Sequence, residues 1–219
     1  MSFIGLLQFY TPDSAFRRAA NHRLQKHFPD KSEQVWRSTR DWQSRLAPSR
    51  PRYGFSLNLL MRYFEWNLSL YRALQEHGMS QVEAGEFVET VAAEYYQPVP
   101  AAMFKLSRLR SAKRETRVKW IFGIITRYFF TPPFVHRHLP SDTGVAFDVT
   151  VCPVADYFKD QGVPPEVTAH AACNLDYCLA REFGIELVRS QTIANGAEYC
   201  DFRWKFSTHR EQSEKAVQS

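Results

Sequence analysis

The stretch from residue 147 to residue 206, FDVTVCPVADYFKDQGVPPEVTAHAACNLDYCLAREFGIELVRSQTIANGAEYCDFRWKF, decides how this chain folds and where its chemistry lies. It holds all four cysteines of the protein. A strand-like run ends at Cys152-Pro153, a helix-like run carries His170, Cys173 and Asp176, and Cys200 stands near the end. We therefore look in this stretch for nucleophilic or metal-binding groups.

Strand patterns occur on both sides of a helical pattern here. Residues Val145–Cys152 alternate apolar and polar side chains, which is typical of a strand, and Pro153 ends the pattern. A short helical turn is expected at 156–160, and a helix over Glu166–Phe183 that stops at Gly184. Two further strands, 185–194 and 197–206, flank Asn195-Gly196, which is the strongest short hairpin signal.

The first 130 residues read as helices separated by proline and glycine. A capping-box pattern, Ser80 followed by Glu83, marks one helix start. The helix beginning near Ser56 is apolar on most of its surface, which is typical of a buried helix. The predicted helices cover residues 12–28, 32–46, 56–77, 80–96 and 103–130, the last with a break near Ser111.

This order of elements predicts an α+β fold, with a helical N-terminal two-thirds packed on a small, mostly antiparallel sheet. We expect one domain over residues 1–206, with its helical part at about 12–130 and its strand–helix–hairpin part at about 144–206. Residues 207–219 read as a polar tail. A chain of 219 residues is long enough for one sizeable core.

Charge and composition favour no macromolecular partner. The net charge is +5, a modest excess that does not require nucleic-acid binding. The segment from Lys105 to Lys119 holds seven basic residues against Glu115 alone, and it suits either a solvated helix end or a contact with membrane or phosphate. The start has no secretory pattern and no apolar run is long enough to span a bilayer, so we expect a cytoplasmic protein without an integral membrane segment.

Three residues of the helical run at 166–183 suit thiol chemistry. His170, Cys173 and Asp176 follow one another at steps of three and so form a rough polar stripe, with Tyr177 beside it. An imidazole or a carboxylate next to a thiol can accept its proton, and the thiolate is the attacking form. Buried cysteines are often inert, however, and Asp176 equally suits a structural ion pair, so both alternatives stay open.

A metal site is the rival interpretation. Cys152, Cys173, Cys200 and His170 have the right chemistry for zinc if they converge. No CxxC pair is present and the spacings are long, so we expect no metal and no cofactor. Walker, GxGxxG, HExxH and GxSxG patterns are also absent from the sequence.

Four short motifs point to a known family. They are Cys152-Pro153-Val154-Ala155-Asp156-Tyr157-Phe158, Cys173-Asn174-Leu175-Asp176, Arg189-Ser190-Gln191-Thr192-Ile193-Ala194-Asn195-Gly196 and Cys200-Asp201-Phe202-Arg203-Trp204. In order and spacing they resemble the L-2-amino-thiazoline-4-carboxylic acid hydrolase family. The family pattern has Arg-Thr where this chain has Arg189-Ser190, which is a mild departure.

The resemblance implies a hydrolase that opens a cyclic isothiourea-like ring to a carbamoyl-cysteine product by breaking a carbon–nitrogen bond. It also implies that Cys152, Cys173, Asp176 and Cys200 line the pocket for this small-molecule substrate. We predict a thiolate nucleophile, Cys173 or Cys200, with Asp176 or His170 accepting or positioning a proton.

Binding of the substrate is assigned to Cys152, Arg189 and Tyr177. Arg189 shares strand parity with Leu187 and Ile193 and therefore points inward, where it needs an anionic partner. That partner is either the substrate carboxylate or a structural carboxylate, Asp148 or Asp176.

Two other classes of function remain open. The final hairpin faintly resembles vinyl-reductase-associated small-molecule-binding domains, which implies a ligand-binding module without catalysis. The basic segment from Lys105 to Lys119 leaves room for a membrane-peripheral accessory protein.

Overall fold

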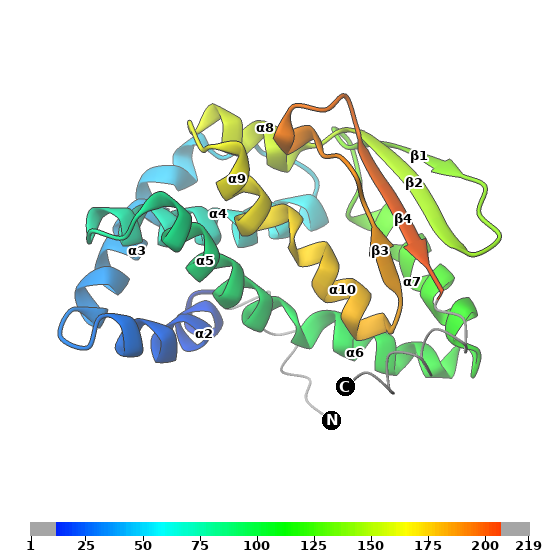
Figure 1. Ribbon diagram of the computed structural model, residues 1–219, viewed down its shortest axis with the longest axis horizontal. Helices are drawn as coiled ribbons and strands as arrows, with labels where there is room; N and C mark the ends of the chain where they lie inside the picture. The colour runs from blue at the N-terminus through cyan, green and yellow to red at the C-terminus, as the bar shows by residue number, and fades with distance from the viewer. Residues whose placement is uncertain (1–11, 207–219) are drawn as a thin grey trace.

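The computed structural model describes residues 12–206, in which helices pack against a four-stranded antiparallel sheet (Figure 1). The predicted α+β class is thereby confirmed. The predicted tail, 207–219, lies outside the described residues. The helical elements are α2 (Pro12–His27), α3 (Ser32–Leu46), η1 (Ala47–Ser49), α4 (Phe55–Glu76), α5 (Gln81–Tyr96), α6 (Pro98–Leu106), η2 (Ser107–Leu109), α7 (Arg114–Tyr128), α8 (Pro153–Asp160), α9 (Pro165–Thr168), η3 (Ala169–Cys173), α10 (Leu175–Phe183) and η4 (Ile193–Asn195).

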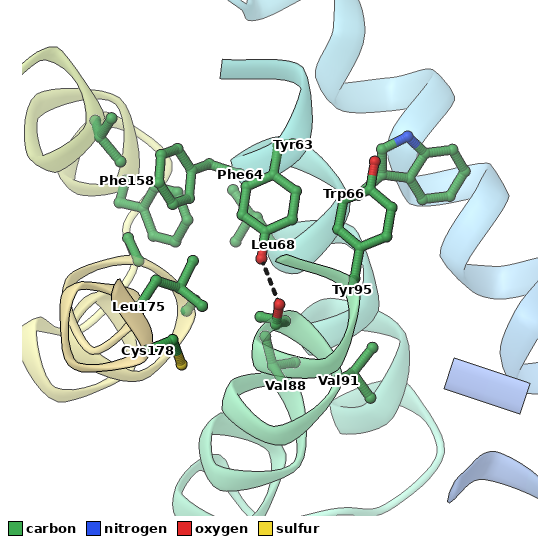
Figure 2. Packing of buried hydrophobic residues seen from close by; sticks show 14 of the residues in the cluster. Tyr63, Phe64, Trp66, Leu68, Val88, Val91, Tyr95, Phe158, Leu175 and Cys178 are labelled. Carbon is green, nitrogen blue, oxygen red and sulfur yellow. Dashed lines mark hydrogen bonds between the residues drawn. The ribbon is translucent and has the colours of Figure 1, made fainter. Parts of the chain in front are cut away.

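Helix α4 lies at the centre of the helical layer. Its residues are buried around nearly the whole helix, which its apolar sequence predicts. Figure 2 shows the packing between α4 and α5, where the hydroxyl of Tyr63 donates to the carbonyl of Ala92 at 2.8 Å. Helix α5 starts where the sequence predicts, because Ser80 and Glu83 form both hydrogen bonds of a capping box.

The sheet has the strand order β1-β2-β4-β3, with every neighbouring pair antiparallel. Its strands are β1 (Val135–Leu139), β2 (Gly144–Val151), β3 (Glu186–Val188) and β4 (Cys200–Lys205). In the central pair Val149 lies opposite Cys200, Phe147 opposite Phe202 and Val145 opposite Trp204. The alternation read from the sequence puts Phe147 and Phe202 on the inner face, where their rings stack at 5.0 Å.

Strand β1 was not predicted. The segment carrying His136 and His138 pairs along β2 as the edge of the sheet. Its residues do not alternate in polarity, and most of its side chains are exposed or half-buried. An edge strand with so little burial leaves no strong periodic signal in the sequence.

The predicted antiparallel pairing of the last two strands in one sheet is confirmed, but the prediction that they meet in a tight turn at Asn195-Gly196 is wrong. Strand β3 ends at Val188 instead of Ala194, and η4 (Ile193–Asn195) forms one turn of 3-10 helix. The side chain of Thr192 accepts from the Asn195 N–H, and Gly196 takes the left-handed conformation at φ 87° that follows this turn. Residues 189–199 therefore form a loop that folds over one end of the sheet.

The carboxylate of Asp201 holds this loop away from the ladder. It accepts hydrogen bonds from the backbone N–H groups of Ser190 and Gln191, each at 2.9 Å, and from the Ser190 hydroxyl at 2.7 Å. Those N–H groups are thus satisfied without a partner strand. This is the physical reason why the predicted strand 185–194 stops early.

The basic segment from Lys105 to Lys119 covers the end of α6, η2 and the start of α7, and the predicted break near Ser111 is confirmed. Arg117 is buried there, where its guanidinium donates to the Ser107 hydroxyl and the Phe104 carbonyl and lies 3.9 Å from the Phe104 ring centroid. Leu109, in contrast, is 90% exposed. Within residues 12–206 no helix has the length and apolarity needed to cross a bilayer.

Candidate functional site

A cavity of about 150 Å³ lies between the helical layer and the inner face of the sheet. Its walls come from α4, α6, α7, α10, β2 and β4, and most of the lining side chains are apolar, many of them aromatic. A cavity of this order holds a small ring-sized molecule, because an apolar void of that volume accommodates benzene. Polymers and nucleotides are too large for it.

Three cysteines line this cavity, and each comes from a different part of the fold. Cys152 follows β2 and is the N-cap residue of α8, Cys173 ends η3, and Cys200 begins β4. Cys178, in contrast, lies outside the cavity lining, and its sulfur accepts a hydrogen bond from Arg181 at 3.0 Å. The structure thus brings together three of the four thiols.

The position of Cys173 depends on a π-helical turn. The predicted helix 166–183 is interrupted by η3, where the N–H of Asn174 donates to the carbonyl of Ala169, five residues back, at 2.8 Å. The side chain of Asn67, fully buried on α4, donates to the carbonyl of Ala171 at 2.6 Å. Turns of this kind are frequent at functional sites because they shift the residues that follow around the helix axis.

Asp176 and Arg189 form the charged part of the cavity wall. The Arg189 guanidinium donates from Nη1 to Oδ2 of Asp176 at 2.8 Å and to the Cys173 carbonyl at 3.1 Å. Its side chain is only 5% exposed, and its charge lies over the rings of Tyr177 and Phe202 at 5.2 and 5.5 Å. Among the described residues, none accepts a hydrogen bond from Nη2 or Nε of Arg189, so those groups are available to a ligand.

Burial changes the acidity of Asp176. The carboxyl is enclosed by the cavity walls although 27% of its side-chain surface is reachable, and burial raises its pKa to about 6 against the opposing effect of Arg189. A carboxyl group with this pKa exchanges a proton readily near neutral pH. Among the described residues, no group hydrogen-bonds to Oδ1 of Asp176, which leaves that oxygen free to accept a proton.

The three cavity thiols are protonated in the free protein. Burial raises the pKa of Cys152 to about 12 and raises the pKa of Cys173 and Cys200 as well. Cys200 has the best support for a thiolate, because its sulfur accepts the Ile193 N–H at 3.2 Å and the nearby Arg189 charge also lowers its pKa. Both of these effects on the Cys200 sulfur come from residues of the loop at 189–199.

The structure does not bring His170 to the cavity. Its Nδ1 lies 2.5 Å from Oε2 of Glu89 on α5, and Asn174 donates to the same oxygen at 2.8 Å. Gly85 leaves room for this imidazole, since a Cβ there would lie 3.2 Å from the ring. Tyr177 is also outside the lining; it is 38% exposed and packs against Arg189.

The structure does not assemble the four zinc ligands considered from the sequence. In the part of the chain that is described, no group of three or more His, Cys, Asp or Glu side chains is arranged to hold a metal ion. His170 faces Glu89 instead of the three cavity thiols.

The apolar walls were missed by sequence reasoning. Met103 on α6, Phe122 and Ile125 on α7 and Phe64 on α4 line the cavity, although they lie far from the cysteines in the sequence. The apolar run 120–130 and the all-round apolarity of α4 were the available signals. Both are equally typical of ordinary core helices, so neither identifies a pocket wall.

The model of the L-2-amino-thiazoline-4-carboxylic acid hydrolase family matches residues 61–204. The chain belongs to this family. The matched range includes the three cavity cysteines, Cys152, Cys173 and Cys200, and the charged pair Asp176 and Arg189. A search of curated proteins found no match.

Two solved structures of an H-NOX protein from S. oneidensis resemble the chain weakly. One, a triple mutant in the Fe(II) ligation state, has a TM-score of 0.41 at 10% sequence identity. The match covers 89% of this chain and 97% of the H-NOX chain. The other, in the Fe(II)NO ligation state, has a TM-score of 0.40 at 11% identity and covers 89% and 98%. A likeness at this level has no bearing on the function of this family member.

Proposed function

We propose that this family member is a hydrolase that opens the ring of a 2-amino-thiazoline carboxylate or a closely similar cyclic amidine, with a cysteine as nucleophile. One observation supports the proposal most directly. Cys152, Cys173 and Cys200 converge with the Asp176–Arg189 pair on a single cavity large enough for one small ring.

Arg189 is the group we assign to the substrate carboxylate. Its Nη1 is held by Asp176 and the Cys173 carbonyl, so the guanidinium is fixed in orientation while Nη2 and Nε stay unused by the described residues. A fixed guanidinium binds a carboxylate with two parallel hydrogen bonds. The negative charge of the substrate then offsets the free-energy cost of burying the Arg189 guanidinium, whose side chain is only 5% exposed.

Cys200 is the nucleophile in this proposal, and Asp176 accepts its proton. The thiolate attacks the ring carbon that lies between nitrogen and sulfur. The bond from this carbon to the ring nitrogen then breaks, and Asp176 returns the proton to that nitrogen. The product of this step is an open chain bound to Cys200 through the former ring carbon, which keeps its bonds to the substrate sulfur and the exocyclic nitrogen.

Water completes the reaction. It adds to the same carbon while Asp176 again accepts a proton, and collapse of the adduct expels the Cys200 thiolate, which is reprotonated. The net change is the addition of one water and the loss of one carbon–nitrogen bond. The Ile193 N–H and the Arg189 charge both favour Cys200 as the leaving thiolate.

A ligand-binding module without catalysis is the second candidate. The raised pKa values of all three cavity thiols favour it, because a neutral thiol is a poor nucleophile. The largely apolar walls also suit simple binding.

Mass spectrometry and a thiol reagent test the proposal together. Purified protein is incubated with 2-amino-thiazoline-4-carboxylate, and ring opening adds the mass of one water. Breaking the carbon–nitrogen bond releases no free thiol, whereas breaking the carbon–sulfur bond does. Cys200→Ser is expected to abolish turnover, while the matched control Cys178→Ser, outside the cavity, retains it. Full turnover by Cys200→Ser would reject this nucleophile, and binding without ring opening would favour the module.

A further inference from the structure

The cavity extends along strand β4. Cys200, Phe202 and Trp204 follow one another on the inner face of this strand, and all three line the cavity. Four residues of strand span roughly 13 Å, so the cavity extends about that far along β4. A thiazoline ring with its carboxylate spans about 6 Å by ordinary bond lengths. The ring alone therefore fills only the part near one end.

The polar groups gather at the Cys200 end. Val149, three residues before Cys152, lies opposite Cys200 in the sheet. Arg189 acts electrostatically on both Cys173 and Cys200, which places all of them in one neighbourhood. Among the described lining residues, Asp176 and Arg189 are the only charged side chains.

The Trp204 end is apolar. The Trp204 ring lies 4.6 Å from the ring of Phe122 on α7, and Met103 on α6 and Ile125 on α7 also line the cavity. None of these side chains carries a charge. Methionine adapts to guests of different shape, because its side chain is unbranched and flexible. This end therefore offers a small surface for hydrocarbon, although the indole N–H of Trp204 is buried without a hydrogen-bond partner among the described residues.

We propose that the substrate of this chain is a cyclic amidine carboxylate that carries a short apolar substituent, which occupies the Trp204 end of the cavity. This inference rests on the proposed function and specifies its substrate class. The ring carbon under attack faces Cys200, the carboxylate faces Arg189, and the ring nitrogen between them faces Asp176. The ring carbon at position 5 then points away from the polar groups, toward Phe122 and Met103. The substituent is attached there.

The volume of the cavity limits the substituent. About 150 Å³ leaves room for the ring and a few further carbon atoms, so a short alkyl chain is the upper bound and a phenyl ring exceeds it. When the apolar end is empty, its lining side chains lack the van der Waals contacts that a substituent would make with them. Filling it makes binding about fourfold tighter for each buried methylene.

A series of 2-amino-thiazoline-4-carboxylates tests this inference, with hydrogen, methyl, ethyl, propyl or phenyl at position 5. Affinity is measured by calorimetry, and ring opening is followed separately by mass. The dissociation constant is expected to fall about fourfold per added methylene until the cavity is full. Equal or falling affinity along the alkyl members overturns the inference, even where the unsubstituted ring is opened and the proposed function stands.

Met103→Trp locates the substituent. A larger side chain on the apolar wall of the cavity should remove the gain for the propyl member first. The matched control Leu109→Trp adds similar bulk at an exposed position three residues beyond the end of α6, outside the cavity lining, and should keep the whole gain. Ile125→Phe, on the opposite helix, provides a second filled variant if Met103→Trp does not fold. Unchanged gains in a folded filled variant overturn the placement.

Binding and turnover separate the two proposals. Rising affinity with ring opening supports both. Rising affinity without ring opening of any member supports the apolar end and overturns the hydrolase. Absence of binding for every member overturns both.

Discussion

Arg189 and Asp176 form an ion pair at 2.8 Å inside the cavity, and the same guanidinium nitrogen also holds the carbonyl of Cys173 at 3.1 Å. One arginine therefore connects the end of β3 with the helical segment that carries two of the polar wall residues. Of the structural partners that the sequence suggested for Arg189, the fold uses Asp176, while Asp148 pairs with Arg137 and Arg203. The proposal assigns a carboxylate ligand to the other nitrogens of Arg189.

Removal of Arg189 is expected to destabilise the protein more at high pH than at low pH. Arg189 opposes the burial that raises the Asp176 pKa to about 6, so without it that pKa rises further. A carboxyl whose pKa is raised in the folded state loses stability as pH increases through that pKa. Arg189→Met should therefore cost about 2 kcal/mol at pH 8 and much less at pH 5, as measured by urea unfolding.

The double variant Arg189→Met with Asp176→Asn is the control. It has no carboxyl group at position 176, so its loss of stability should not depend on pH. An equal loss at pH 5 and pH 8 in the single variant would contradict this account.

The activity should depend on the ionisation of Asp176. As a proton acceptor it must be deprotonated, so kcat/KM is expected to rise with pH through about 6 and then level off. Asp176→Asn should lower kcat/KM by about a hundredfold or more and remove this rise. The exposed Asp142→Asn is the matched control. A rise near pH 6 that persists in Asp176→Asn would assign the proton to another group.

The cavity thiols should react slowly with iodoacetamide at pH 7.5. Burial raises their pKa values, so little thiolate is present, and alkylation should be at least about tenfold slower than that of free cysteine. Cys200 should react first among them, because the Ile193 N–H supports its thiolate. Peptide mass mapping gives the order, and a bound carboxylate ligand should protect Cys200 but not Cys178. Modification of Cys152 ahead of Cys200 would refute this order.

Asn67→Ala is expected to destabilise the protein by about 2 kcal/mol. The substitution leaves the buried carbonyl of Ala171 without the side-chain amide that donates to it at 2.6 Å. Ser69→Ala, two residues along α4 and equally buried, removes only a bond within that helix and should cost about 1 kcal/mol or less. Thermal melting of both variants checks the difference, and equal losses would show that the bond to Ala171 has no special weight.

Local signals were enough for much of the fold. The Ser80–Glu83 box marks the start of α5, and the alternation in β2 and β4 gives the inner face of the central strand pair correctly. Interactions between distant residues decided the rest. The π-turn at 169–173 is bonded by Asn67, 104 residues away, and the loop after β3 is held by Asp201. No window of neighbouring residues contains those partners.

The candidate site divides in the same way. The clustering of Cys152, Cys173 and Cys200 was visible because strand and helix ends concentrate them in one stretch. The orientation of His170 was not, because the π-turn changes the angular spacing on which the polar stripe depended. The apolar half of the cavity comes from α6 and α7, and chain position gave no indication of it.

The cavity between the helical layer and the sheet also affects how long the protein survives in a cell. The helices and the sheet enclose it jointly, so a guest that fills it touches both layers and is released when they separate. A ligand at a hundred times its dissociation constant adds about 2.7 kcal/mol to the free energy of unfolding. Proteases act on the opened chain, so we expect the lifetime of this protein to lengthen when its ligand is abundant and to shorten when the ligand runs out.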